Sequence, residues 1–186
     1  MRLTPFVLVT GNANKLAEAR RIVGAELEAV ELDLPEIQSL DLEEVLRAKG
    51  AEAWRRLQRP LVVEDTAMEL AALGGFPGPL VKWMLGAVGP EGLAQCALSL
   101  GDARATVRCQ VLYIDGETAV LGEGVDTGEL VLPPRGDAGF GWDPVFVAEG
   151  SARTWGERGQ GEKDRGGHRG KAWRQLMSEL RSQEPL

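Results

Sequence analysis

The sequence predicts an α/β protein with a mixed, partly antiparallel, twisted central sheet flanked by helices. An apolar run at residues 6–9 is followed by Gly11 and then by apolar residues at helical spacing, the usual opening of an α/β unit. Residues 104–115 alternate between apolar and polar side chains and end on an Asp-Gly hairpin signal, so part of the sheet is antiparallel. Residues 173–180 predict a closing amphipathic helix.

The other elements follow in chain order. Residues 27–32 can form a second strand, and apolar spacing predicts a helix over 42–57 that a proline ends. Residues 61–63 are typical of a short buried strand. A proline is well placed as the first residue of a helix over 90–100.

Turn-forming residues dominate two further stretches. Residues 74–79 are a dense turn signal, and a partner strand follows the hairpin through residues 120–121. Residues 133–170 are rich in Gly, Pro and charge and predict a long loop region, interrupted by a short strand at 145–147. Because no repeat or linker divides the chain, we expect one domain over residues 1–186.

Composition excludes several classes of function. The 186 residues carry 21 Lys+Arg and 28 Asp+Glu, a net charge of −7, which argues against nucleic acid or an anionic membrane as partner. No apolar run approaches the roughly 18–20 residues of a membrane helix. Two cysteines and one histidine exclude a disulfide framework and a thiolate or His-rich metal site. We expect a soluble cytoplasmic protein.

Two motifs are candidates for binding an anion and a metal. Residues 10–15 place a Gly-Asn loop and a lysine at a helix start, which can bind an anion; a plain turn with an Asn cap is the alternative. Glu64, Asp65 and Thr66 follow a buried strand, where open α/β sheets bind ligands; ordinary solvation of a strand end is the alternative. Mg²⁺ prefers such carboxylate oxygens together with phosphate oxygens.

Two further motifs lie in the polar region near the C-terminus. Residues 140–144 put two aromatics beside glycine in a loop, which suits stacking on a flat ligand; anchoring of the loop to the core is the alternative. Lys163 lies near His168 and Arg169, for which a solvated basic cluster is the alternative. The histidine stands among charge and glycine, so a buried core position is not expected for it.

The order of these motifs resembles the inosine triphosphate pyrophosphatase family over nearly the whole chain. The matching segments are Thr10-Gly11-Asn12 with Lys15, Asp33-Leu34-Pro35-Glu36, Glu64-Asp65-Thr66, residues 73–79, Lys82-Trp83, Phe140-Gly141-Trp142-Asp143-Pro144 and His168-Arg169. The resemblance implies Mg²⁺-dependent hydrolysis of non-standard purine nucleoside triphosphates (ITP, dITP, XTP) to the monophosphate and pyrophosphate. It also implies two lobes around a nucleotide cleft and a homodimer. Residues 76–85 are apolar enough to serve as the contact surface; packing of this segment into the core is the alternative.

The resemblance also assigns roles by position. Asp65 is the implied catalytic base, with Glu64 beside it, and Glu36 and Asp65 are the implied metal ligands. The implied substrate-binding residues are Thr10, Gly11, Asn12, Asn14, Lys15, Lys49, Thr66, Lys82, Phe140, Gly141, Trp142, Asp143, Lys163, His168 and Arg169. One departure is Gly167, where the family has serine before His-Arg. It bears on the local geometry of the pair and removes no charged group.

These roles predict a mechanism. Four lysines and Mg²⁺ would offset the charge of the triphosphate while a water aligned by Asp65 attacks the α-phosphorus. Arg169 or His168 would donate to O6 of hypoxanthine or xanthine, and Asp143 would accept from N1–H; adenine reverses both groups. Phe140 or Trp142 would stack on the base.

Three other functions stay open at this point. One is a related pyrophosphatase that acts on modified pyrimidines or other abnormal nucleotides. Another is a nucleotide sensor that does not hydrolyse its ligand. The last is an RNA-binding module that uses the basic residues near Lys163, against which the net charge and the ten aromatic residues argue.

Overall fold

A computed structural model describes residues 5–24 and 27–182. Seven strands form one sheet in the order β2-β1-β3-β5-β6-β7, with β4 paired to β3. The strands are β1 (Val7–Val9), β2 (Glu28–Val30), β3 (Leu61–Leu70), β4 (Pro77–Gly78), β5 (Arg104–Ile114), β6 (Ala119–Leu130) and β7 (Phe146–Ala148). The helices are α1 (Ala13–Val23), α2 (Leu42–Leu57), α3 (Val81–Ser99), α4 (Gln160–Gly166) and α5 (His168–Ser182), with 3₁₀ turns at Ala71–Leu73 and Trp155–Glu157.

The sheet is mixed, as predicted. β1 pairs in parallel with β2 and β3, whereas β3, β5, β6 and β7 are antiparallel neighbours. The hairpin between β5 and β6 turns at Asp115, whose side chain accepts from the backbone N–H groups of Glu117 and Thr118. This turn confirms the hairpin that the Asp-Gly signal predicted, and Gly116 takes the positive φ of 94° that the turn requires.

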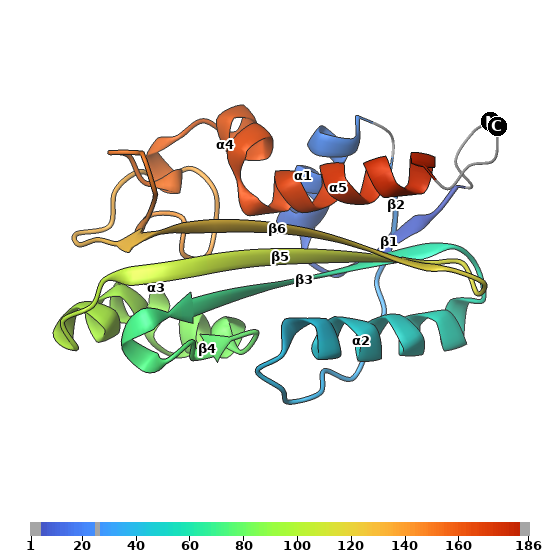
Figure 1. Ribbon diagram of the computed structural model, residues 1–186, viewed down its shortest axis with the longest axis horizontal. Coiled ribbons are helices and arrows are strands. Elements are labelled where there is room, and N and C mark those ends of the chain that lie inside the picture. The colour runs from blue at the N-terminus through green and yellow to red at the C-terminus, as the bar shows by residue number, and fades with distance from the viewer. Residues whose placement is uncertain (1–4, 25–26, 183–186) are drawn as a thin grey trace.

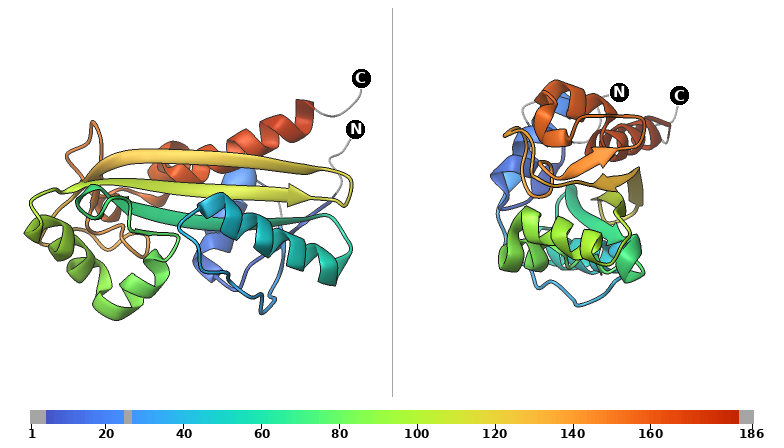
Figure 2. Two further views of the ribbon diagram at one scale, coloured as in Figure 1. Left: turned by 60° about the horizontal axis from the view of Figure 1, so that its bottom comes forward. Right: turned by 90° about the vertical axis from the view of Figure 1, so that its left-hand side faces the viewer.

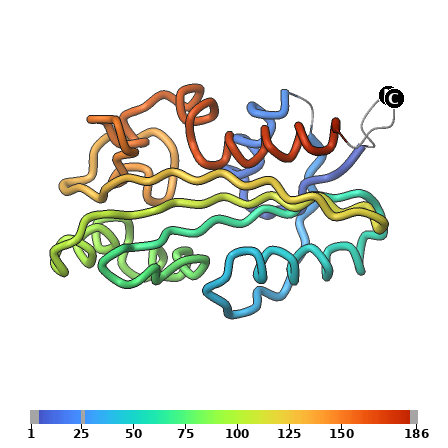
Figure 3. Tube along the Cα trace, in the orientation of Figure 1, coloured from blue at the N-terminus to red at the C-terminus, as the bar shows by residue number. Residues whose placement is uncertain are grey.

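Helices cover both faces of the sheet. Figures 1 and 2 show α1, α4 and α5 on one face and α2 and α3 on the other. In the tube of Figure 3, α1 and α5 lie side by side although they come from opposite ends of the sequence. Leu8, Ala19, Trp173 and Leu176 belong to the core under α1 and α5. This burial of both faces explains the short continuous apolar runs of β1 and of the first part of β3.

β3 differs from its prediction in a way that creates the site. The strand runs through Glu64-Asp65-Thr66 to Leu70, so these three residues lie in mid-strand and not at a strand end. β1 pairs with β3 only as far as Val63, and β4 begins its pairing at Met68. Residues 64–67 therefore have a strand neighbour on the β5 side, while their other edge faces the loop that follows β1.

Two helical segments were not predicted, namely the first half of α3 and the whole of α4. α3 begins at Val81 and bends at Gly89 (φ 68°), after which its second half begins at the predicted Pro90. α4 occupies part of the predicted loop over 133–170, and α5 begins at His168. Both were missed because the first half of α3 follows a Gly/Pro turn directly and α4 has almost no apolar residues.

Three other expectations have separate outcomes. Within residues 5–24 and 27–182 no helix combines the length and apolarity needed to cross a membrane. The predicted second strand over 27–32 is shorter, at Glu28–Val30. The two-lobe arrangement stays a prediction.

Candidate active site

One cavity of about 1010 Å³ lies beside the open edge of β3. Its lining comes from the loop after β1, the segment before α2, α2 itself, β3, the start of α3, the loop before β7, α4 and α5. Of the residues predicted to form the site, those lining it are Thr10, Gly11, Asn12, Lys15, Glu36, Lys49, Glu64, Asp65, Thr66, Lys82, Phe140, Gly141, Trp142, Asp143, Lys163, His168 and Arg169. The fold thus brings together motifs spread over 160 positions, between residues 10 and 169.

The loop after β1 is both a helix cap and part of the cavity wall. Asn12 is the N-cap of α1, and its Oδ1 accepts from the backbone N–H groups of Asn14 (3.0 Å) and Lys15 (3.2 Å). Thr10 Oγ1 in turn accepts from Asn12 N at 3.1 Å. Asn14 is exposed and is not among the residues that line the cavity. The Asn-cap interpretation is therefore confirmed, and the capped loop still faces the cavity.

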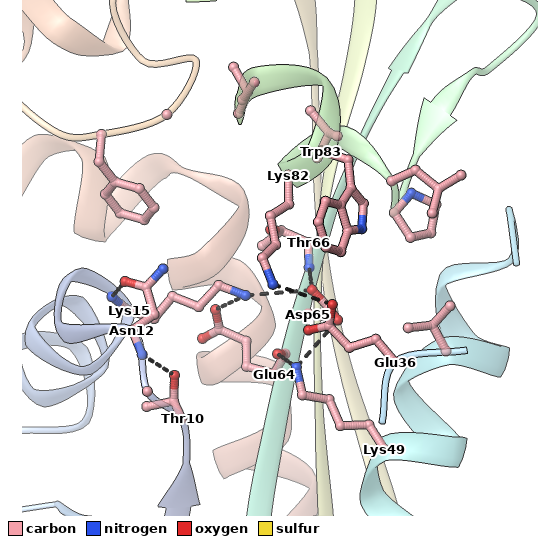
Figure 4. A pocket seen from close by; sticks show the side chains of 18 of the residues that line it. Thr10, Asn12, Lys15, Glu36, Lys49, Glu64, Asp65, Thr66, Lys82 and Trp83 are labelled. Carbon is pink, nitrogen blue, oxygen red and sulfur yellow. Dashed lines mark hydrogen bonds and ion pairs between the residues drawn. The ribbon is translucent and has the colours of Figure 1, made fainter. Parts of the chain in front are cut away.

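Lysines surround the carboxylates in the middle of the cavity (Figure 4). Lys49 Nζ lies 3.4 Å from Asp65 Oδ2, and Lys15 Nζ lies 3.6 Å from Asp65 Oδ1. Lys82 Nζ lies 3.4 Å from Glu36 Oε2. In Figure 4 the carboxylates of Glu36 and Asp65 point into the same space. Chain segments before α2, in α2, on β3 and in α3 thus meet at one group of charges.

The surroundings of Asp65 favour its ionised form. Burial, the largest single influence, raises the pKa of this carboxyl, and the charges of Lys15 and Lys49 act in the opposite direction. The backbone N–H of Thr66, 2.8 Å from Asp65 Oδ1, adds a hydrogen bond to the charged form. Together they hold the pKa of Asp65 below its usual range.

A buried charge network lies behind this group. Glu18 on α1 accepts hydrogen bonds from Lys163 Nζ at 3.1 Å and from the Arg169 guanidinium. Arg169 Nε donates to Glu64 Oε1 at 2.9 Å, and Trp173 Nε1 donates to Glu64 Oε2 at 3.0 Å. Both oxygens of Glu64 are therefore held by donors, and the network fixes Arg169 between two carboxylates.

Phe140 covers the cationic part of this network. The centre of its ring lies 4.9 Å from Lys163 Nζ and 5.4 Å from Arg169 Cζ. Asp143 Oδ2 accepts from Phe140 N at 2.8 Å and also from Lys163 Nζ. The loop is thus tied down by Asp143 and leaves its aromatic ring over two cations, a favourable contact for the ring face.

His168 and Arg169 are buried, with exposed fractions of 2% and 4%, so the solvated basic cluster is wrong for this pair. Lys163 is buried as well. The sequence suggested solvation because the acidic partners of these residues are distant in the chain. Burial lowers the pKa of His168 below its usual value, although Asp126 beside it acts in the opposite direction. The His168 ring lies 6.0 Å from that of Trp142, at 33°. Trp142 is buried in the hydrophobic core with Val145 and Phe146, so anchoring of the loop is confirmed for this residue, and stacking on a base stays a prediction.

Two ring nitrogens in this part of the wall are buried without a hydrogen-bond partner among the described residues. They are Trp142 Nε1 and His168 Nδ1. Unpartnered buried polar atoms are uncommon in native proteins. His168 Nδ1 nevertheless lies 3.5 Å from Asp126 Oδ2, so it faces this carboxylate.

Sequence reasoning missed two buried carboxylates, Glu18 and Asp126. Glu18 follows Lys15 by three positions, which places both on neighbouring parts of one helix face. That spacing beside the cavity loop was an available signal for Glu18. Asp126 lies in the middle of β6 and carries no local signal of a role.

Comparison with protein families matches residues 6–179 to the Ham1 family. The chain belongs to the Ham1 family. This confirms the family that the motif order predicted, over nearly the whole length.

Curated relatives and solved structures agree with this Ham1 assignment. The inosine triphosphate pyrophosphatase of Yarrowia lipolytica is 42% identical over 175 residues, 91% of this chain and 92% of the relative. That of Puccinia graminis f. sp. tritici is 37% identical over 178 residues, 90% of this chain and 92% of the relative. The structure of a HAM1 protein from Coxiella burnetii superposes with a TM-score of 0.82 at 26% identity, covering 95% of this chain and 98% of that one.

Glu18 of this Ham1 protein is expected to be important for stability. Burial raises the pKa of its carboxyl, but Arg169 and Lys163 outweigh burial and lower it. Glu18→Gln leaves both cations with weaker partners, so we expect the free energy of unfolding to fall by about 3 kcal/mol at pH 7. The pKa of Glu18 is lower in the folded state than in the unfolded state. The difference in free energy of unfolding between wild type and variant should therefore be largest above the unfolded-state pKa of about 4.3, and it should shrink as the pH falls below that value.

Urea unfolding between pH 7 and pH 3.5 measures this difference in the Ham1 protein. Glu43→Gln is the matched control, because Glu43 forms an exposed i,i+4 pair with Arg47 and should contribute little. A loss for Glu18→Gln no larger than that of the control would contradict the account of the buried network.

Proposed function

We propose that this chain hydrolyses non-standard purine nucleoside triphosphates, ITP, dITP and XTP, to the monophosphate and pyrophosphate in a Mg²⁺-dependent reaction. The curated relatives named above are inosine triphosphate pyrophosphatases, and they are covered almost completely. The observation that carries the proposal is Asp65, which is kept ionised between Lys15 and Lys49 in the wall of the cavity. A cavity of this size suits a whole nucleotide.

The lysines would bind the triphosphate. A phosphate oxygen offers Lys15, Lys49 and Lys82 a stronger partner than the carboxylates at 3.4–3.6 Å that they face now. Lys15 and Lys49 are largely buried, with side-chain exposures of 13% and 15%, so the ion pairs they form with a phosphate are weakly screened. Lys163 lies on the side of the cavity proposed for the purine base, since its Nζ donates to Asp143 and lies over the Phe140 ring.

Glu36 and Asp65 would hold the magnesium ion. No group of three or more His, Cys, Asp or Glu side chains that could hold a metal occurs in the described residues. Mg²⁺ at nucleotide sites is held by one or two carboxylates together with phosphate oxygens and water, so two carboxylates facing one space are a suitable donor set. When bound, the ion would neutralise charge on the phosphates.

Asp65 would also accept the proton of the attacking water. Its two oxygens face the cavity lysines and the Thr66 amide, and a bound triphosphate would draw the lysines away. Glu64 is less suited to this step, because Arg169 and Trp173 already donate to both of its oxygens. We therefore assign the role of catalytic base to Asp65. Glu64 is assigned the role of positioning Arg169.

The purine base would be recognised on the side of the cavity opposite the phosphate-binding lysines. Arg169 uses two of its five N–H groups on Glu18 and Glu64, which leaves donors for O6 of hypoxanthine or xanthine. Asp143 Oδ1 would accept from N1–H, while its Oδ2 holds the loop. Adenine has the opposite polarity at both positions and would leave buried groups unpaired.

A substrate panel tests the proposed function. The purified chain with Mg²⁺ is assayed with ITP, XTP, dUTP, GTP and ATP, and we expect kcat/KM for ITP and XTP to exceed that for ATP by about 100-fold or more. Preference for dUTP would favour the related pyrophosphatase for abnormal pyrimidines. Tight ITP binding with no Mg²⁺-dependent turnover would favour the sensor.

We also propose a homodimer and a cytoplasmic location. Support for the dimer comes from Phe76 and Trp83, whose exposed fractions are 44% and 66%, within the apolar segment over residues 76–85. Sedimentation of the purified chain at micromolar concentration distinguishes dimer from monomer. Support for the location comes from two unpaired cysteines, Cys96 and Cys109.

A further inference from the structure

Helix α5 begins directly after a glycine that cannot cap it. Gly167 has the extended backbone of an N-cap residue (φ −81°, ψ 165°), and its C=O accepts from Lys171 N. Its N–H donates to Lys163 O at 2.7 Å, and a Cβ placed on Gly167 would lie 2.8 Å from that same oxygen. The tight junction between α4 and α5 therefore favours glycine, and the first N–H groups of α5 need an acceptor from elsewhere.

Asp126 on β6 supplies that acceptor. Its Oδ2 accepts from His168 N at 2.6 Å, and its Oδ1 accepts from Lys171 Nζ, one turn further along α5. Lys171 Nζ also donates to Val125 O at 2.9 Å. Asp126 is 7% exposed, and a buried carboxylate at a helix N-terminus is favoured by the helix dipole as well as by the hydrogen bond.

Two glycines bring Asp126 within reach of the helix. Gly122, Gly124 and Asp126 alternate along β6 and so share the sheet face that α5 covers (Figure 1). A Cβ on Gly124 would lie 1.9 Å from His168 O, and one on Gly122 would lie 2.4 Å from Ala172 O. The backbone of α5 thus packs directly on β6. Asp126, the next residue after Gly124 on this face, contacts the start of α5.

The capped residue and its neighbour both line the cavity. His168 carries the capped N–H, with its Nδ1 3.5 Å from Asp126 Oδ2, and Arg169 follows it. Arg169 is held at its guanidinium by Glu18 and Glu64, while its backbone is held through the start of α5. A shift of the first turn would therefore move the two side chains proposed to donate to the base, with less effect on the phosphate side around Asp65.

We infer that Asp126 is a positioning residue for base recognition: its carboxylate caps α5 in place of a side chain at Gly167 and fixes where His168 and Arg169 present their donors. This rests on the proposed function, since a positioning effect on the base is read through purine nucleotide turnover. This inference also accounts for Gly167, the position at which the chain departs from the serine of the family pattern, because the Cβ of a serine at position 167 would crowd Lys163 O.

Steady-state kinetics with ITP and ATP test this role in three variants. Asp126→Ala removes the cap, and we expect KM for ITP to rise and the ITP/ATP ratio of kcat/KM to fall by about 5–20-fold, because a smaller fraction of the protein has the helix start in place. For ATP, kcat should stay within about twofold of wild type. Asp126→Asn keeps an acceptor oxygen and should retain at least about half of the discrimination. Lys171→Ala, the matched control, removes the other partner of Asp126 and should leave the ratio within about twofold.

Several outcomes would overturn the role. Equal losses for ITP and ATP in Asp126→Ala, or a lowered melting temperature with an unchanged ITP/ATP ratio, would make Asp126 a structural residue only. Loss of more than about half of the wild-type discrimination in Asp126→Asn would contradict the cap, and this test needs no result from the alanine variant. Wild-type protein that fails to hydrolyse ITP overturns the proposed function instead, before any variant is compared.

Discussion

Asp65→Asn is expected to lower kcat for ITP by about 10²–10⁴-fold, because the amide can neither accept the proton of the attacking water nor bind a metal as a carboxylate does. Binding of the nucleotide should survive, since Lys15 and Lys49 remain and lose a competing carboxylate, while Lys82 keeps its contact with Glu36. We therefore expect the Kd for ITP, measured by calorimetry, to stay within about fivefold of wild type while turnover is lost.

Asp102→Asn is the matched control for this change. Asp102 pairs with Arg104 at the protein surface, and neither residue lines the cavity. Turnover by this control should be that of wild type. Asp65→Asn protein that keeps more than about a fifth of the wild-type kcat would remove Asp65 from the chemical step.

Arg169→Ala is expected to narrow the gap between ITP and ATP. Loss of a charged hydrogen bond to O6 costs about 1.5–3 kcal/mol, so the ITP/ATP ratio of kcat/KM should fall roughly 10–150-fold. The same change leaves Glu18 and Glu64 buried without a main partner, and a lower melting temperature is expected as well. The ratio is the diagnostic quantity, because lower stability alone reduces both activities equally.

Two further variants separate these effects. Arg169→Lys keeps a positive charge beside both carboxylates but loses the fork of donors, so it should be more stable than Arg169→Ala and still discriminate poorly. Arg108→Ala removes an arginine that is paired to Glu69 and does not line the cavity, and should not change the ratio. Unchanged discrimination in Arg169→Ala would move base reading to another residue.

Local patterns predicted the elements whose signals lie in adjacent residues. The strand, loop and helix at the start of the chain follow from one apolar run and Asn12, which caps α1 through its own neighbours. β3 was predicted too short, because polar residues at 64–66 interrupt the apolar run although pairing with β5 continues through them. Tertiary pairing thus overrode the local pattern there.

The site was predictable where a motif carries its own chemistry and not where the chemistry depends on distant partners. Asp65 and Lys15 lie in recognisable motifs and line the cavity. Glu18 meets Arg169 across 151 positions, and Asp126 meets His168 across 42, so neither pairing leaves a trace in spacing. The burial of His168 was misjudged for the same reason, since its acidic neighbour comes from a different element.

Hydrolysis of ITP in ¹⁸O-labelled water tests the central claim most directly. Attack of water on the α-phosphorus, with Asp65 as base and Lys15, Lys49 and Lys82 on the phosphates, predicts ¹⁸O in the phosphate of IMP and unlabelled pyrophosphate, released only with Mg²⁺. Mass spectrometry of both products reads the position of the label. Release of orthophosphate, or ¹⁸O in the pyrophosphate, would contradict the account.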